Sequence, residues 1–128
     1  MFEQGLMAML SVATDPYLLF LIFVTTILGV VIGVLPGLGA TTGAALLLPF
    51  TLTMDPVHAI AVLATIYVSA TFAGSITAIL INTPGTSAAA ATTFDGYPLA
   101  QKGEAGRELG VAVISSTVGG VFSVIILC

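Results

Sequence analysis

The positions of the charged residues constrain the fold of this chain more than any other feature of its sequence. No Asp, Glu, Lys or Arg lies between Asp15 and Asp55, none between Asp55 and Asp95, and none after Glu108. The whole chain of 128 residues has only six acidic and two basic ones, whereas about 25% of the residues in a soluble domain are charged. A soluble protein could not build its outer surface from this sequence, so lipid must cover most of the chain.

Three apolar stretches between these charges are long enough to span a membrane, since about 20 apolar residues cross the roughly 30 Å of hydrocarbon. They cover residues 17–35, 57–81 and 109 to beyond 126. The first two follow Asp15-Pro16 and Asp55-Pro56, and an acid at the N-cap with proline at the first helical position is a typical helix start. Before them, residues 1–13 predict a short interfacial helix with one apolar side. That side consists of Phe2, Leu6, Met9 and Leu10.

Two further apolar stretches are interrupted by a proline-glycine pair. Pro36-Gly37 ends the first span, and the apolar residues 40–50 that follow are too short to cross. Pro84-Gly85 ends the second span, and residues 87–94 resume it as a short, alanine-rich run. Irregular backbone at membrane depth must face protein or a water-filled cavity, so each break predicts a segment turned inward. We therefore expect an all-α integral membrane protein, in which residues 1–128 form one transmembrane domain with about three transmembrane helices and two Pro-Gly-broken re-entrant or half-helix segments.

Residues 95–108 form the one hydrophilic loop that the sequence predicts. Lys102 and Arg107, the only basic residues of the chain, lie in it, and the positive-inside rule therefore favours the cytoplasm for this loop. The acidic residues are scattered, and no charged tract suited to binding nucleic acid is present. The single cysteine, Cys128, permits no internal disulfide.

The first break has two explanations. Its glycines would let a substrate or an ion approach the backbone, the helix after it would direct N–H groups at an anion, and carbonyls freed by the proline suit Na⁺. Alternatively, Gly29, Gly33 and Gly37 form a series of small residues along one helix face, which would make this a kinked helix with a packing groove.

The second break, residues 82–87, concentrates polar side chains and a Pro-Gly pair between two apolar segments. Burying such groups without partners costs roughly 1–3 kcal/mol each, so they are not expected to face lipid. A capped helix end would explain one break of this kind. Two matching interruptions, however, are the best indication of a transporter site that a sequence offers.

Other chemistries find little support in the sequence. Residues 37–43 imitate a dinucleotide-binding motif but lack the surrounding strands and the acid about 20 residues later. His58 has no second His or Cys beside it to form a metal site, and we interpret it as a hydrated histidine at the membrane interface. There is no Ser/His/Asp or Cys/His set and no pair of intramembrane carboxylates. We therefore predict that the protein is not an enzyme and has no catalytic residues, no metal and no cofactor.

Five segments along the chain carry a specific resemblance: Gly33–Gly39, Leu46–Pro49, Gly74–Thr86 with the alanine run after it, Phe94–Pro98 and Lys102–Gly106. In this order they resemble the TctA family, the large membrane subunit of the tripartite tricarboxylate transporters. The resemblance extends over nearly the whole chain. Because family members are several-fold longer, it implies that residues 1–128 correspond to the N-terminal part of such a subunit.

The resemblance also implies a cellular role. The protein would be a multi-pass subunit of a bacterial inner membrane, working with a small membrane subunit (TctB-like) and a periplasmic solute-binding protein (TctC-like) that delivers a small carboxylate. Uptake would be coupled to a cation, Na⁺ or H⁺, and would not use ATP. A non-transporting assembly subunit that packs partner helices through its glycines is the alternative, and a membrane-embedded enzyme ranks third.

We expect the site between the two breaks, which would face each other near mid-membrane. No Arg or Lys lies in any span, so a carboxylate would be met by backbone N–H groups at half-helix ends and by hydroxyls. The residues predicted to bind the substrate are Gly37, Gly39, Thr41, Thr42, Pro84, Gly85, Thr86 and Ser87. Those predicted to face the cation, through freed carbonyls and the Asn82 side chain, are Val34, Leu35, Asn82 and Thr83.

Overall fold

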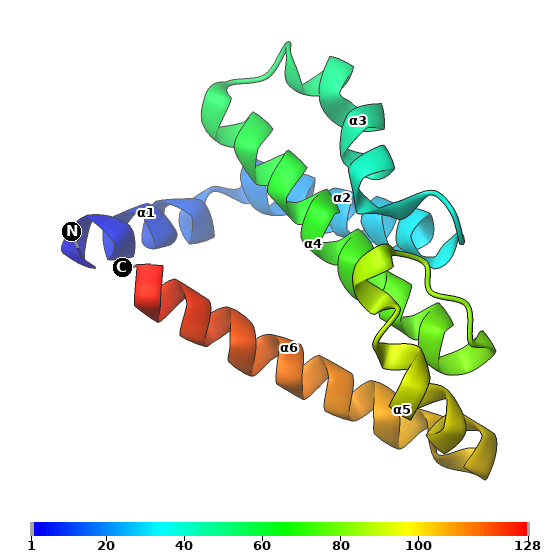
Figure 1. Cartoon of the computed structure of the whole chain (residues 1–128). Coiled ribbons are helices and arrows are strands. Elements are labelled where there is room, and N and C mark those ends of the chain that lie inside the picture. The colour runs from blue at the N-terminus through cyan, green and yellow to red at the C-terminus, as the bar shows by residue number, and fades with distance from the viewer. Residues whose placement is uncertain (1, 128) are drawn as a thin grey trace.

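The computed structural model describes residues 2–127, in which helices dominate and no strand occurs (Figure 1). In chain order the elements are α1 (Phe2–Thr14), α2 (Pro16–Val34), α3 (Gly39–Thr51), α4 (Pro56–Ile81), the 3₁₀ turn η1 (Ser87–Ala89), α5 (Thr92–Leu99), the π-helical turn η2 (Ala100–Glu104) and α6 (Ala105–Leu127). Three helical segments are long and apolar enough to cross a membrane: α2, α4 and the run from α5 through α6. The protein is therefore an all-α membrane protein, as the positions of its charges predicted.

The starts of α2 and α4 lie side by side. Asp15 caps α2, because its Oδ1 accepts hydrogen bonds from the backbone N–H groups of Tyr17 (3.1 Å) and Leu18 (3.4 Å). His58, in the first turn of α4, lies between two acids: its Nε2 is 3.7 Å from Asp15 Oδ2 and its Nδ1 is 3.5 Å from Asp55 Oδ2. Since both helices begin beside this histidine, α2 and α4 run parallel. The His58 imidazole is also mostly buried and tilted against the Tyr17 ring.

The parallel arrangement requires the chain to return between α2 and α4, and α3 makes this return. With 13 residues, α3 rises about 20 Å, whereas the 19 residues of α2 rise about 28 Å. The turn at residues 35–38 and the segment 52–55 supply the remaining distance. As a helix, α3 is shorter than the roughly 20 residues that cross a membrane, as predicted for residues 40–50, but together with its flanking segments it connects the end of α2 to the start of α4.

The core lies where α2 crosses α4, with α3 packed against both. A Cβ on Gly29 would meet the Ser69 side chain, and a Cβ on Gly33 would overlap the backbone of Ala70. These two glycines let the helix backbones approach closely, which is how small residues stabilise helix pairs in membranes. The side chains of α4 that are fully buried are Ile66, Ala70, Ala73, Ala78 and Ile79.

The segment after α4 differs from the sequence prediction in two places. Residues 87–94 do not continue as a helix after Pro84; η1 is a single turn, and α5 begins only at Thr92. Thr86 is the N-cap of η1 and is extended (φ −131°, ψ 157°), as is usual for a residue that precedes a helical turn.

The second difference concerns residues 95–108, which are helical rather than a loop. Only Gly103 departs from helical geometry, with φ 84°. The prediction was wrong because helix propensity is a weak constraint that packing overrides. Here α5 packs on α4 through Gly96, where a Cβ would lie 2.8 Å from Cγ1 of Ile79. The charged side chains of this region remain largely exposed.

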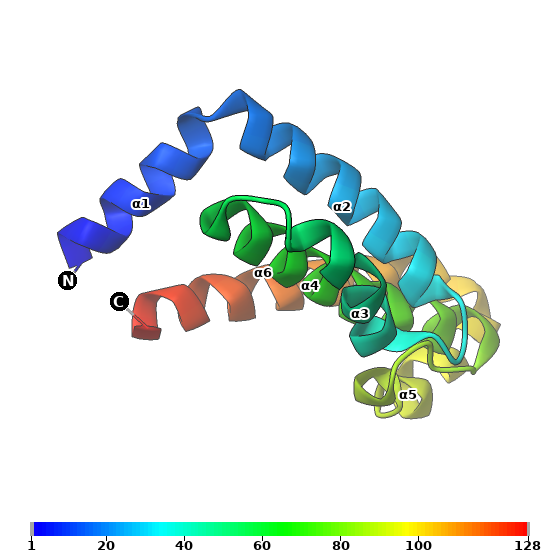
Figure 2. The same cartoon turned by 90° about the horizontal axis from the view of Figure 1, so that it is seen from above.

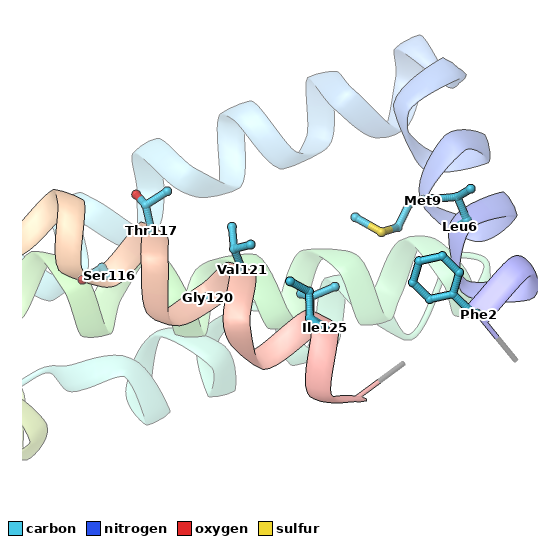
Figure 3. Close-up of a pocket in the computed structure, with 9 residues that line it drawn as sticks. Phe2, Leu6, Met9, Ser116, Thr117, Gly120, Val121 and Ile125 are labelled. Atoms are coloured by element: carbon cyan, nitrogen blue, oxygen red, sulfur yellow. The ribbon is translucent and has the colours of Figure 1, made fainter.

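The α6 helix runs back from this bend toward α1, so that its C-terminal half and α1 enclose an apolar groove of about 500 Å³ (Figure 3). Phe2, Leu6 and Met9 line one side, and Val121 and Ile125 line the other. The predicted helix over residues 1–13 is thus present as α1, and three of the four residues of its predicted apolar side, Phe2, Leu6 and Met9, line the groove, whereas Leu10 does not. Viewed from above, α1 and α2 meet at an angle, so α1 diverges from the core (Figure 2). The groove lies at the opposite end of the molecule from the two breaks (Figure 1).

Candidate functional site

The second break begins with a left-handed residue that ends α4. Asn82 has φ 56° and ψ 27°, and its backbone N–H bonds to the Thr77 carbonyl. The N–H of Thr83 reaches the same oxygen at 3.5 Å. A left-handed cap of this kind satisfies carbonyls that a helix end would otherwise leave free. Asparagine is one of the few residues other than glycine that adopts this conformation readily. The Asn82 and Thr83 side chains are exposed.

The break then folds back along α4 to the level of Gly74. The Gly85 N–H donates to the Gly74 carbonyl (3.3 Å), and so does the Thr77 hydroxyl (3.1 Å). Thr86 lies directly over the missing side chain of Gly74, where a Cβ would be 2.8 Å from the Thr86 hydroxyl oxygen. Gly74 is seven residues before the end of α4, so the return covers roughly 10 Å along the helix axis.

The returning segment also packs against the C-terminal end of α2. A Cβ on Gly85 would overlap the Gly33 carbonyl oxygen and would lie 3.2 Å from Oγ1 of Thr77. Gly85 and Thr86 are both buried. We call the contact of Gly33, Gly74, Thr77, Gly85 and Thr86 the glycine joint; it connects α2, α4 and the second break.

The carbonyl of Gly33 is unpaired within the described residues 2–127. Its two possible helical donors are Pro36, which has no N–H, and Gly37, which turns away with φ 93°. The neighbouring bonds run elsewhere, from the Leu35 N–H to the Ile32 carbonyl (3.2 Å) and from the Leu38 N–H to the Leu35 carbonyl (3.3 Å). Gly33 is nevertheless buried. A buried backbone carbonyl without a donor is rare in folded proteins, and this one lies at the negative end of the α2 dipole.

Thr86 carries the second unpaired polar atom of the joint. Its side chain is 9% exposed, and its hydroxyl oxygen is fully buried without a hydrogen-bond partner. The buried hydroxyls in the spans behave differently: those of Thr25, Ser69 and Thr77 all bond to carbonyls of their own helix. Thr86 lies outside any regular helix and cannot bond in this way.

The first break is open, in contrast to the second. Gly37 and Gly39 have φ 93° and 68°, and no atom lies within 4 Å of the Cβ position of either. The α3 helix starts at Gly39, and no side chain caps its N-terminus. Thr41 and Thr42 are exposed in its first turn. This end presents free N–H groups and two hydroxyls, which favour an anion.

The predicted site residues therefore fall into two groups. Gly85 meets the end of α2 at Gly33, beside Val34, and Thr86 lies over Gly74 of α4. In contrast, Gly37, Gly39, Thr41 and Thr42 lie on the open side of the turn at residues 35–38. Pro84 is half-buried, and Ser87 and Leu35 are exposed. The expected N–H groups of a helix after Pro84 are reduced to the single turn η1. Sequence reasoning missed Gly33 and Thr77. The signal for the free Gly33 carbonyl was the Pro36-Gly37 pair, because these two residues occupy the positions from which a helix would donate a hydrogen bond to that carbonyl.

The sequence profile of the Tripartite tricarboxylate transporter TctA family matches residues 19–128 of this chain. The chain belongs to the TctA family. This TctA chain is also 47% identical, over 105 residues, to an Agrobacterium vitis protein described as an uncharacterized 52.8 kDa protein in the TAR-I ttuC' 3' region. The alignment covers 82% of this chain and 21% of that relative, so the chain spans about a fifth of the relative's length. No solved structure matches.

Proposed function

We propose that this TctA chain forms part of the membrane subunit of a cation-coupled transporter that takes up small carboxylates, in the inner membrane of a bacterium. A small TctB-like membrane subunit and a periplasmic TctC-like binding protein would complete the transporter. The coupling ion would be Na⁺ or H⁺, and the subunit would perform no enzymatic reaction. The observation that carries the proposal is the turn at residues 35–38, which joins two helix ends of opposite polarity.

The two ends of this turn suit ions of opposite charge. The C-terminus of α2 carries about half a negative charge and the N-terminus of α3 about half a positive one. Interrupted helices in secondary transporters use such ends to hold an anionic substrate and a coupling cation. Because none of the spanning helices contains Lys or Arg before Arg107, the α3 N–H groups with Thr41 and Thr42 are the groups on this segment best suited to a carboxylate.

The alternative, an assembly subunit without transport activity, loses part of its basis. Gly29 and Gly33, which were expected to receive a partner helix, contact α4 of the same chain instead. Gly119 and Gly120 on α6, in contrast, face open space and remain available for contact with a partner helix. Uptake measurements distinguish the two functions, because an assembly subunit would tolerate changes at the open break.

The test is uptake of a radiolabelled tricarboxylate by a full-length TctA protein carrying this segment, reconstituted in liposomes with both partner subunits. Thr41→Val with Thr42→Val removes two exposed hydroxyls without altering the core. A hydrogen bond to a charged group contributes about 1.5–3 kcal/mol, so we expect KM to rise at least tenfold. The matched control is Thr71→Val, since that hydroxyl bonds to the Tyr67 carbonyl of its own helix (2.7 Å). Unchanged uptake by the double variant would place the substrate elsewhere.

A second variant addresses Asn82. Asn82→Gly keeps the left-handed cap and removes only the amide, whereas alanine at this position would add backbone strain. If the amide serves transport, Asn82→Gly lowers uptake while Val31→Leu, an exposed change on α2, does not. Equal uptake by both variants would assign Asn82 a capping role only.

A further inference from the structure

We infer that the glycine joint is a binding site for one dehydrated monovalent cation, Na⁺, held by the Gly33 carbonyl and the hydroxyls of Thr77 and Thr86. The inference rests on the proposed function and identifies the ion that would be coupled to transport, with its ligands. It moves the cation from the exposed Asn82 and Thr83, where the sequence placed it, to the buried contact between the second break and α2.

Two independent observations point to a ligand here. Gly33 is buried, its carbonyl oxygen lies against Gly85, and this oxygen receives no hydrogen bond from residues 2–127. The Thr86 hydroxyl is also buried and has no partner. Each such group costs free energy unless something binds it. The Gly33 carbonyl lies against Gly85, and the Thr86 hydroxyl, on the next residue, lies against Gly74.

The third oxygen comes from α4. Thr77 Oγ1 uses its hydrogen to bond the Gly74 carbonyl (3.1 Å), which leaves its lone pairs available as acceptors. The point where a Cβ of Gly85 would lie is bordered by both Thr77 Oγ1, at 3.2 Å, and the Gly33 carbonyl. Glycine at position 85 therefore keeps side-chain atoms out of the space between two of the three oxygens.

The chemistry of these oxygens selects the ion. All three are uncharged, and the only formal electrostatic help is the partial negative charge at the end of α2. Divalent cations are usually held with carboxylates, and residues 56–94, like residues 16–54, contain none. The same absence leaves no side chain in the joint that could carry a transported proton. Backbone carbonyls and hydroxyls at an unwound helix end are the ligands that transporters use for Na⁺.

The test is thermal unfolding of a purified full-length TctA protein carrying this segment, in NaCl, KCl or choline chloride at equal ionic strength. A ligand that binds only the folded state raises Tm once its concentration greatly exceeds Kd. We expect NaCl to raise Tm by several degrees and choline chloride to have no effect. Thr86→Ser, which keeps the hydroxyl, should retain the Na⁺-dependent shift.

Thr86→Val should lose this shift. Its Tm without Na⁺ should be no lower than that of the unmodified protein, because valine fills the same space and removes an unpaired buried hydroxyl. Thr71→Val is the control and should keep the full shift. Thr86→Ala provides the second readout if valine prevents folding. A full Na⁺-dependent shift in either folded variant, or no shift in the unmodified protein, would overturn the assignment.

These results are separable from those on transport. A protein that takes up carboxylate but shows no Na⁺-dependent stabilisation refutes the cation site and leaves the proposed function standing. A Na⁺-dependent shift that depends on Thr86, in a protein that takes up no carboxylate, refutes the proposed function and leaves the cation site standing.

Discussion

Replacing Gly33 by alanine is expected to push α2 and α4 apart. The added Cβ would lie 2.7 Å from Cα and 2.8 Å from the carbonyl carbon of Ala70, where ordinary contact begins at 3.4 Å. The added Cβ would also overlap the Ala70 carbonyl oxygen, so the helices must separate by more than about 0.7 Å. Because the obstacle is backbone, no side chain can rotate away, and the cost should lie near the upper end of the 1–3 kcal/mol that overpacking typically causes.

The control is Gly110→Ala on α6, where a Cβ meets open space. Both substitutions gain the same helix propensity of about 1 kcal/mol. The difference between the two variants in unfolding free energy therefore reports the steric overlap alone, and we expect this difference to be about 3 kcal/mol. The assay is reversible unfolding in mixed micelles, followed by circular dichroism as the fraction of denaturing detergent is raised. A difference below about 1 kcal/mol would refute the close approach of α2 and α4 at Gly33.

Three further predictions concern the ends of the helices. Asp15→Ala removes the side-chain cap of α2 and should lower the unfolding free energy by about 1 kcal/mol. Asp55→Ala should lower it less, because the Asp55 side chain makes no capping hydrogen bond. Equal losses in the two variants would contradict the capping role of Asp15. Gly103→Ala places a side chain at φ 84° and should cost about 1–2 kcal/mol in the same unfolding assay. Lys102→Cys, in a chain whose native cysteine is replaced by serine, should react with an impermeant maleimide only from the cytoplasmic side; labelling from the periplasm would reverse the orientation.

The spanning helices could be predicted from the sequence because the signals for them are local. Asp-Pro begins α2 and α4 within one residue of the expected positions, and the Pro-Gly breaks at residues 36–37 and 84–85 indicate where they end. The direction of packing could not be predicted in this way. It follows from His58 contacting both Asp15 and Asp55, and nothing in the periodicity of either helix indicates that contact.

The candidate site was predictable only in part, for the same reason. Proline and glycine at positions 36 and 37 locate the unpaired carbonyls to within one turn of α2. Which carbonyl is buried depends on Gly85, far along the chain, whose N–H bonds to Gly74 (3.3 Å). Likewise, Gly96 and Pro98 indicated a loop, and the packing of α5 on Ile79 overrode them. Contacts between distant segments decided each of these outcomes.

The unpaired carbonyl of Gly33 has a consequence for biosynthesis. When α2 enters the membrane, Gly85 and Thr86 have not yet followed it there, and an unsatisfied backbone group in hydrocarbon costs several kcal/mol. The last turn of α2 must therefore remain hydrated, or sheltered by the insertion machinery, until α4 and the second break have followed. Substitutions at Gly85 should then reduce the amount of correctly inserted protein as well as its activity, because they prevent a late segment from packing over the end of an early helix.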